Sequence, residues 1–211
     1  MIYLVITNRP KFLKFATAQM AKCPRAHHVV LANGPEFDGW KGHSTKAFFF
    51  YNKTWRHNSD AFNWFRVNFQ KHDDLFLMDD DIYLEGDSCR ECEGWLEKGW
   101  DRVFYTRSHL FDTQAGETAT VNWRPRQIGG AWAMSRDLWR LKPWADRPVD
   151  AMLRWFNELP QHNIKLIPIP KITYLIHNEN VVLKRSVRMD FNVPNNPKLV
   201  NEVIKCGLAK E

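Results

Sequence analysis

Three adjacent aspartates, Asp79, Asp80 and Asp81, directly follow the apolar run 75–78. Neighbouring carboxylates repel one another, and folding alone gives no reason to place three of them at the end of a buried segment. A divalent cation relieves this repulsion, and hard oxygen ligands suit Mg²⁺ or Mn²⁺. In an extended chain Asp79 and Asp81 point to the same side, so this pair can address one ion. The alternative is a solvated acidic turn whose aspartates cap a helix.

Other motifs that combine such residues with a metal or a phosphate do not fit this sequence. An EF-hand starting at the first aspartate would need Gly and Glu where the chain has Leu84 and Arg90. A Walker B strand needs a P-loop partner, and the segment 34–41 lacks the Gly-Lys-Ser/Thr ending. Cys89 and Cys92 have half the spacing of a zinc site without a second pair, so the four cysteines are predicted to be free thiols.

Strand and helix patterns alternate along the chain and would position these acids. Short apolar runs bounded by turn residues predict strands, and apolar residues spaced three or four apart predict helices. The predicted strands cover residues 2–7, 28–32, 75–78, 102–106, 127–135, 164–168 and 172–176. The predicted helices cover residues 11–22, 59–71, 88–98, 136–141, 148–159 and 197–206. Two polar or aperiodic stretches are predicted as loops, 34–56 with one short element and 110–126.

This alternation is typical of a single α/β domain of Rossmann-like type, with a mostly parallel central sheet and helices on both faces. We expect residues 1–185 to form this domain, and the basic residues 186–211 to form an extension that packs on it or flanks it. Ligands of such sheets bind beyond the carboxyl ends of the strands. The turn 7–9 and the three aspartates each follow a predicted strand, so both clusters should lie at that edge.

The charge of the chain is divided unevenly. The 211 residues carry 30 Lys and Arg against 24 Asp and Glu, a net charge of +6. Residues 73–101 hold eleven acids and two bases, which leaves 28 bases and 13 acids for the remainder. A basic body of this kind suggests a polyanionic partner. No run reaches the roughly 18–20 apolar residues of a membrane span and no signal peptide is apparent, so we expect a cytoplasmic protein.

The order of these motifs resembles that of GT-A-fold nucleotide-sugar glycosyltransferases of the family 2 type. The resemblance lies in the strand and turn 2–10, the strand that ends at Asn33-Gly34, the Asp-x-Asp-like segment 76–81, the segment 129–136 and His177. It covers about residues 1–180. It implies a GT-A domain that transfers a sugar, with UDP-sugar as the expected donor, to a hydroxyl acceptor.

The resemblance also implies roles for individual residues. Thr7, Asn8 and Arg9 would cup the nucleotide, Asp80 would reach its ribose, and Asp79 and Asp81 would hold Mn²⁺ or Mg²⁺ beneath the diphosphate, with His177 as a third metal ligand. An inverting transfer needs a general base. The resemblance points to Asp150 for this role and to Asp146 as second choice. Arg126, Gly130 and Trp132 are expected to contact the acceptor.

The acceptor itself is predicted from the basic body. Five motifs place Arg or Lys beside Trp, a combination that suits phosphate contacts and base stacking, namely 53–56, 123–126, 139–140, 142–144 and 154–155. This favours DNA, with a hydroxymethylated pyrimidine as acceptor, as for some bacteriophage sugar transferases that act in the host cytoplasm. The alternative is a peripheral enzyme of lipopolysaccharide or capsule assembly, whose basic face meets anionic lipid. A metal-dependent nuclease and a non-catalytic nucleic-acid-binding module also remain open.

Overall fold

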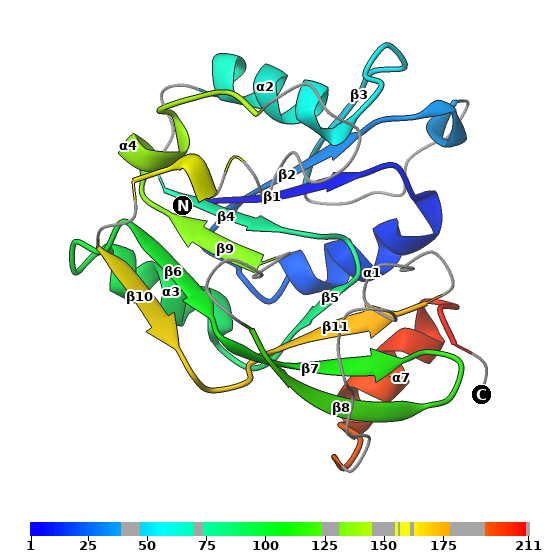
Figure 1. The fold of residues 1–211 in the computed structure, drawn as a ribbon. Helices are drawn as coiled ribbons and strands as arrows, with labels where there is room; N and C mark the ends of the chain where they lie inside the picture. The colour runs from blue at the N-terminus through cyan, green and yellow to red at the C-terminus, as the bar shows by residue number, and fades with distance from the viewer. Residues whose placement is uncertain are drawn as a thin grey trace.

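A mixed α/β fold with two sheets is seen in the computed structural model, which describes residues 1–38, 47–69, 74–123, 131–144, 155, 157–160, 163–177 and 193–209 (Figure 1). The strands are β1 (Ile2–Thr7), β2 (His27–Ala32), β3 (Phe48–Tyr51), β4 (Leu75–Met78), β5 (Ile82–Leu84), β6 (Arg102–Tyr105), β7 (Arg107–Asp112), β8 (Glu117–Asn122), β9 (Ala131–Met134), β10 (Ile164–Ile167) and β11 (Ile172–Ile176). The helices are α1 (Pro10–Met20), α2 (Asn58–Asn68), α3 (Ser88–Leu96), α4 (Arg136–Trp139), α7 (Pro197–Lys205) and the 3-10 turn η1 (Pro35–Phe37).

The central sheet has seven strands in the order β10-β6-β9-β4-β1-β2-β3. Strand β9 runs antiparallel to both of its neighbours, β4 and β6, while the other pairings in this sheet are parallel. Strands β1 and β4 are buried on both faces, which explains why their sequences are unbroken apolar runs. The predicted fold class, a mostly parallel sheet of Rossmann-like type, is confirmed.

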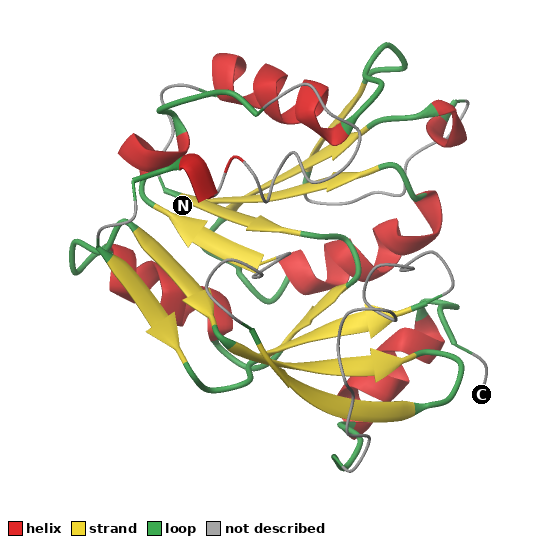
Figure 2. Cartoon of the chain, viewed as in Figure 1, coloured by secondary structure: helices red, strands yellow, loops and turns green. Residues whose placement is uncertain are grey.

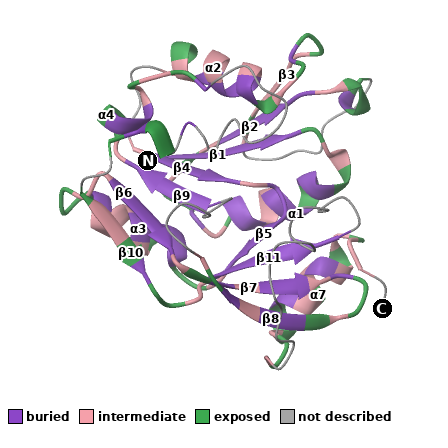
Figure 3. Ribbon diagram, in the orientation of Figure 1, coloured by how far each residue is buried: buried purple, intermediate pink, exposed green. Residues whose placement is uncertain are grey.

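Helices cover both faces of this sheet, as the sequence predicts (Figure 2). Side chains alternate along β1, so that Tyr3 and Val5 pack on the side of α1 and α3, whereas Ile2, Leu4 and Ile6 pack on the side of α2 and α4. The two resulting cores hold the β1 backbone in place, and Figure 3 shows β1 buried along its length. The turn that follows β1 is therefore built on a rigid strand.

A second sheet, in the order β5-β11-β7-β8, corrects the prediction of a polar loop at 110–126. Strands β7 and β8 form an antiparallel hairpin with six paired positions. The threonines of β8 account for the error, because Thr118 and Thr120 make the segment read as polar although threonine suits a pleated strand. Strand β3 similarly lies within the region 34–56, where only one short element was expected, and forms an edge of the central sheet.

Helix α1 lies between the two sheets. Leu13 and Ala16 face the central sheet, while Phe12 and Phe15 pack in a separate cluster with the second sheet and α7. Leu199 and Val203 of α7 belong to that same cluster.

Within the described part of the chain, no helix is long and apolar enough to cross a membrane. The helix predicted at 148–159 lies mostly outside the described residues.

Candidate functional site

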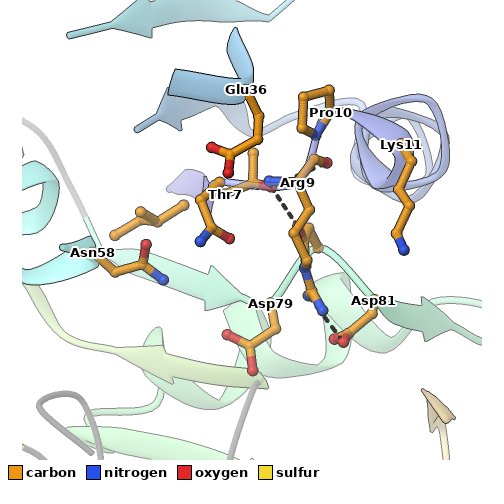
Figure 4. Close-up of a pocket in the computed structure, with 11 residues that line it drawn as sticks. Thr7, Arg9, Pro10, Lys11, Glu36, Asn58, Asp79 and Asp81 are labelled. Carbon is orange, nitrogen blue, oxygen red and sulfur yellow. Dashed lines mark hydrogen bonds and ion pairs between the residues drawn. The ribbon is translucent and has the colours of Figure 1, made fainter. Parts of the chain in front are cut away.

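A pocket of about 820 Å³ opens at the carboxyl ends of β1 and β4 (Figure 4). Its lining residues are Ile6, Thr7, Asn8, Arg9, Pro10, Lys11, Glu36, Asn58, Asp79, Asp80 and Asp81. Because β1 and β4 are parallel neighbours, their ends bring the turn 7–9 and the three aspartates to one place. The structure thus joins in a single pocket two clusters that are about 70 residues apart in the sequence.

The turn between β1 and α1 is tied directly to the aspartates. The Thr7 hydroxyl oxygen accepts a hydrogen bond from the backbone N–H of Arg9 at 3.0 Å, and the same hydroxyl donates to the Asp80 carboxylate. Pro10 then opens α1 at a position where a missing N–H costs the helix nothing. This turn aims the Arg9 side chain across the pocket floor toward the aspartates (Figure 4).

The Arg9 guanidinium lies between Asp80, Asp81 and His177. Its Nε donates to Asp80 Oδ2 at 3.2 Å and its Nη2 to Asp81 Oδ2 at 3.0 Å, with a further Nη2 contact to Asp80. Its Nη1 lies 3.0 Å from His177 Nε2. Phe12 completes the setting, because the guanidinium carbon stands 4.5 Å from its ring centre. A single cation thus contacts two buried carboxylates and an imidazole.

His177 follows β11 and is brought to the aspartates from the second sheet. Its Nε2 lies 3.1 Å from Asp81 Oδ2, and its ring centre lies 4.6 Å from that of Phe12. Both His177 and Asp81 are buried, with exposed fractions of 7% and 6%. The sequence-based grouping of these two residues is therefore matched by direct contact.

The aspartates differ in their electrostatic setting. Burial and the carboxylates of Asp81 and Asp80 raise the pKa of Asp79 well above its usual value. Although burial opposes it, the hydrogen bond with His177 and the charge of Arg9 hold the pKa of Asp81 below its usual value. The ionised form is therefore favoured at Asp81 and disfavoured at Asp79.

The donor set suits a divalent cation only in part. Among the described residues no group of three His, Cys, Asp or Glu gathers to hold a metal ion, and the Asp79 carboxylate points away from Arg9 and Asp81 (Figure 4). Asp81 and His177 do form a suitable pair, because two ligands each roughly 2.1 Å from one ion and at right angles stand about 3.0 Å apart. Magnesium-type ions are commonly held by one or two carboxylates together with substrate phosphates. Asp81 and His177 thus fit an ion whose remaining ligands come from a bound diphosphate.

Of the residues expected to contact the acceptor, the structure describes Trp132. Trp132 lies on β9 with an exposed fraction of 1%, paired in register with Leu77 and Phe104 of the adjacent strands. It fills the core on the α2 side of the sheet, and this burial argues against its expected contact with an acceptor. The other four residues with an expected role there, Arg126, Gly130, Asp146 and Asp150, lie outside the described residues.

Sequence reasoning missed Glu36 and Asn58, which complete the pocket. Glu36 lies in η1 directly after β2, and Asn58 is the first residue of α2. The order β4-β1-β2 places the end of β2 beside the end of β1, so an acid that follows β2 reaches the same edge. In the sequence, Glu36 could have been noticed as an acid just after the strand end at Asn33-Gly34. The sequence around Asn58 gave no comparable indication of a place in the pocket.

Replacement of Asp79 by asparagine tests the electrostatics of the pocket. In the absence of divalent cations we expect Asp79→Asn to raise the free energy of unfolding at neutral pH by about 1 kcal/mol. Because its pKa is raised in the folded chain, wild-type Asp79 costs stability as the pH rises from its unfolded value of ~3.9 through its folded value. The gain should therefore shrink toward zero as the pH falls toward about 4. Urea unfolding across this pH range measures it.

Asp87 provides the matched control, since it is an exposed acid of the same acidic segment. The hydrogen bond and charge of Lys171 hold its pKa below the usual value, so the sign is opposite. Asp87→Asn must not stabilise the protein as the pH rises. A gain at Asp79→Asn that does not change with pH would contradict the assignment of a raised pKa.

Comparisons with known proteins bear on the fold. No protein-family model matches the chain, and no curated protein matches its sequence. Among solved structures, a protein assigned as a glucose-1-phosphate thymidylyltransferase from Bacillus anthracis is similar, with a TM-score of 0.53 and 11% identity over 82% of this chain and 89% of that one. The inositol-1-phosphate CTP transferase of T. maritima reaches a TM-score of 0.47 at 10% identity, over 98% of this chain and 96% of that one.

A 4-diphosphocytidyl-2C-methyl-D-erythritol synthase from Anaerococcus prevotii has a TM-score of 0.44 at 9% identity, over 80% of this chain and 86% of that one. By its name the B. anthracis protein is a thymidylyltransferase and not a glycosyltransferase. At such low identities only the fold is shared. The first comparison therefore supports the mixed α/β, Rossmann-like fold alone and gives no support to transfer onto bacteriophage DNA.

Proposed function

We propose that this chain is a glycosyltransferase that moves a sugar from a nucleotide-sugar, with UDP-sugar as the first donor to test, to a hydroxyl acceptor. The observation that carries the proposal is the single pocket at the carboxyl ends of β1 and β4, where Arg9 and Lys11 lie beside Asp79–Asp81. Cationic side chains suit a diphosphate, and the acidic and amide groups of Glu36 and Asn58 suit ribose and base. The pocket volume is that of a site for a ligand of this size.

The proposed reaction breaks the bond between the sugar's anomeric carbon and the diphosphate oxygen, and forms a bond from that carbon to the acceptor oxygen. The acceptor's proton passes to a general base, for which Asp150 is proposed. Asp81 and His177 would hold a divalent cation, which when bound would neutralise the charge that develops on the departing diphosphate. Thr7 keeps Asp80 oriented through the hydrogen bond from its hydroxyl.

A second candidate, nucleotidyl transfer, is favoured by the fold shared with the thymidylyltransferase of B. anthracis. That reaction would consume a nucleoside triphosphate and a sugar phosphate and release pyrophosphate. The products separate the candidates, since glycosyl transfer releases a nucleoside diphosphate and nucleotidyl transfer releases pyrophosphate.

Donor binding is the first test. UDP together with Mn²⁺, at about 100 times its dissociation constant, should stabilise the folded chain by about 2.7 kcal/mol. For a chain of this size this corresponds to a rise in melting temperature of roughly 5–10 °C. A thermal-shift series measures it, with adenosine at equal concentration as a control that lacks the diphosphate. No shift at saturating UDP and Mn²⁺ would contradict the nucleotide-sugar site.

The acceptor requires its own experiment, because the structure removes part of the argument for DNA. In four of the five basic motifs the tryptophan is buried in the core on the α2 side of the sheet, namely Trp55, Trp139, Trp144 and Trp155. Base stacking on these rings is thereby excluded, and the charge of the basic body is what still favours DNA. Mass spectrometry after incubation with sugar nucleotides would compare hydroxymethylcytosine DNA, plain DNA and an anionic glycolipid. A mass increase confined to one of them identifies the acceptor class.

A further inference from the structure

The Arg9 guanidinium lies where a cation shared by Asp81 and His177 would have to lie. Its Nη2 is 3.0 Å from Asp81 Oδ2 and its Nη1 is 3.0 Å from His177 Nε2, while those two ligand atoms are 3.1 Å apart. Four atoms, Nη1 and Nη2 of Arg9 together with Asp81 Oδ2 and His177 Nε2, thus border the small volume that a bound ion would fill. An arginine side chain and a metal ion cannot occupy it together.

The contacts of His177 Nε2 show that this arrangement is not fully satisfied. A ring nitrogen either donates a hydrogen bond or accepts one. If Nε2 carries the proton it suits Asp81 but faces an N–H of Arg9, and if it carries the lone pair it suits Arg9 but faces a carboxylate. A metal ion would suit both neighbours, since it takes the nitrogen lone pair and a carboxylate oxygen as adjacent ligands.

We propose that Arg9 is the resident cation of this site in the absence of donor, and that it withdraws when a divalent cation enters together with the nucleotide diphosphate. The inference rests on the proposed function for the identity of the donor. Asp80 and Asp81 are buried, and a buried carboxylate that loses its partner is strongly destabilising. Arg9 therefore leaves at least cost when another cation takes its place, which couples the two events.

Arg9 is also placed so that it can leave. Its side chain keeps an exposed fraction of 22%, against 2% for Asp80, and it lines the open pocket. Asp80 retains the hydrogen bond from the Thr7 hydroxyl after Arg9 has moved, so the turn keeps one attachment to the aspartates. The presence of Arg9 between the acidic side chains and His177 agrees with the absence, among the described residues, of a preformed metal site with three ligands.

The test measures Mn²⁺ binding by electron paramagnetic resonance, with no nucleotide present and then with UDP. We expect wild-type protein to bind Mn²⁺ weakly alone and tightly with UDP. Arg9→Gln should bind Mn²⁺ alone about tenfold more tightly than wild type, because the competing charge-assisted hydrogen bonds are gone. Lys14→Gln removes one positive charge from an exposed position of α1 and should behave as wild type.

Two further measurements guard against a variant that fails to fold. Arg9→Lys keeps the positive charge with fewer directed contacts and should bind Mn²⁺ with intermediate affinity. Mn²⁺ should also raise the melting temperature of Arg9→Gln more than that of wild type, because the ion then replaces the missing cation. An equal rise in both proteins would overturn the proposal.

The results separate this inference from the proposed function. If Arg9→Gln binds Mn²⁺ alone no better than wild type, while wild type binds Mn²⁺ with UDP, Arg9 is not the resident cation although the donor site stands. If Arg9→Gln gains Mn²⁺ and no protein binds UDP, Arg9 does occupy the cation position and the proposed donor is wrong. If no protein binds Mn²⁺ under either condition, both are overturned.

Discussion

Replacing Asp81 by asparagine is expected to lower the rate of sugar transfer by about a hundredfold to a thousandfold, the range that follows from loss of one directed charge-stabilising group in an active site. The pKa of Asp81 is held below its usual value, and its carboxylate contacts both Arg9 and His177. Asparagine keeps the shape and one oxygen but removes the charge that a divalent cation requires. Release of UDP from a UDP-sugar, followed over time, measures the rate.

The control for this variant is Asp87→Asn, which removes an exposed acid from the same acidic segment and should leave the rate unchanged. Asp81→Asn weakens a buried network and should also lower the free energy of unfolding, by about 1–3 kcal/mol. Near-ultraviolet circular dichroism must therefore confirm that the variant is folded at the assay temperature. A folded Asp81→Asn protein with wild-type activity would remove Asp81 from the proposed mechanism.

The second large effect is expected at Trp132. Trp132→Ala should lower the free energy of unfolding by about 3–5 kcal/mol, because the ring lies in the core on the α2 side of the central sheet and its removal leaves a cavity. Trp100 is the matched control, since it is partly exposed and its ring lies beside Trp95 and Lys165. Trp100→Ala should cost about 1 kcal/mol or less. Urea unfolding of the three proteins gives both values.

The milder variant Trp132→Phe separates a core role from an acceptor role. A phenylalanine keeps most of the apolar volume, so the fold should persist with a smaller loss of stability. The KM for the acceptor should then equal that of wild type, since a buried ring makes no contact with a substrate. A rise of about tenfold in this KM, with the stability unchanged, would restore Trp132 to the acceptor site.

The sequence predicts the parts of this fold whose pattern is carried by burial. Strands β1 and β4 are buried on both faces, so their runs of apolar residues are unbroken and their ends are easy to locate. In the hairpin β7–β8, strand β8 carries threonines and mixes buried with exposed residues, so it lacks an unbroken apolar run. The antiparallel direction of β9 depends on its neighbouring strands and not on its own residues. These features are decided by tertiary pairing, which a single sequence does not display.

The same distinction applies to the site. Sequence reasoning could place the turn 7–9 and the aspartates at one edge, because parallel strands end together. The contact between Arg9 and Asp81 could not be predicted, since it depends on the side-chain direction that the Thr7 turn imposes. Glu36 was missed because its place depends on the sheet order, in which β2 adjoins β1.

The position of α1 between the two sheets has a consequence for how the chain tolerates change. Phe12 supports the Arg9 guanidinium and the His177 ring on one side, and on the other it belongs to the apolar cluster completed by Leu199 and Val203 of α7. The floor of the pocket is therefore continuous with the packing of the last helix. Shortening or remodelling of α7 would be transmitted to the pocket floor through a single aromatic ring, so this helix is a poor place to cut, tag or fuse the protein.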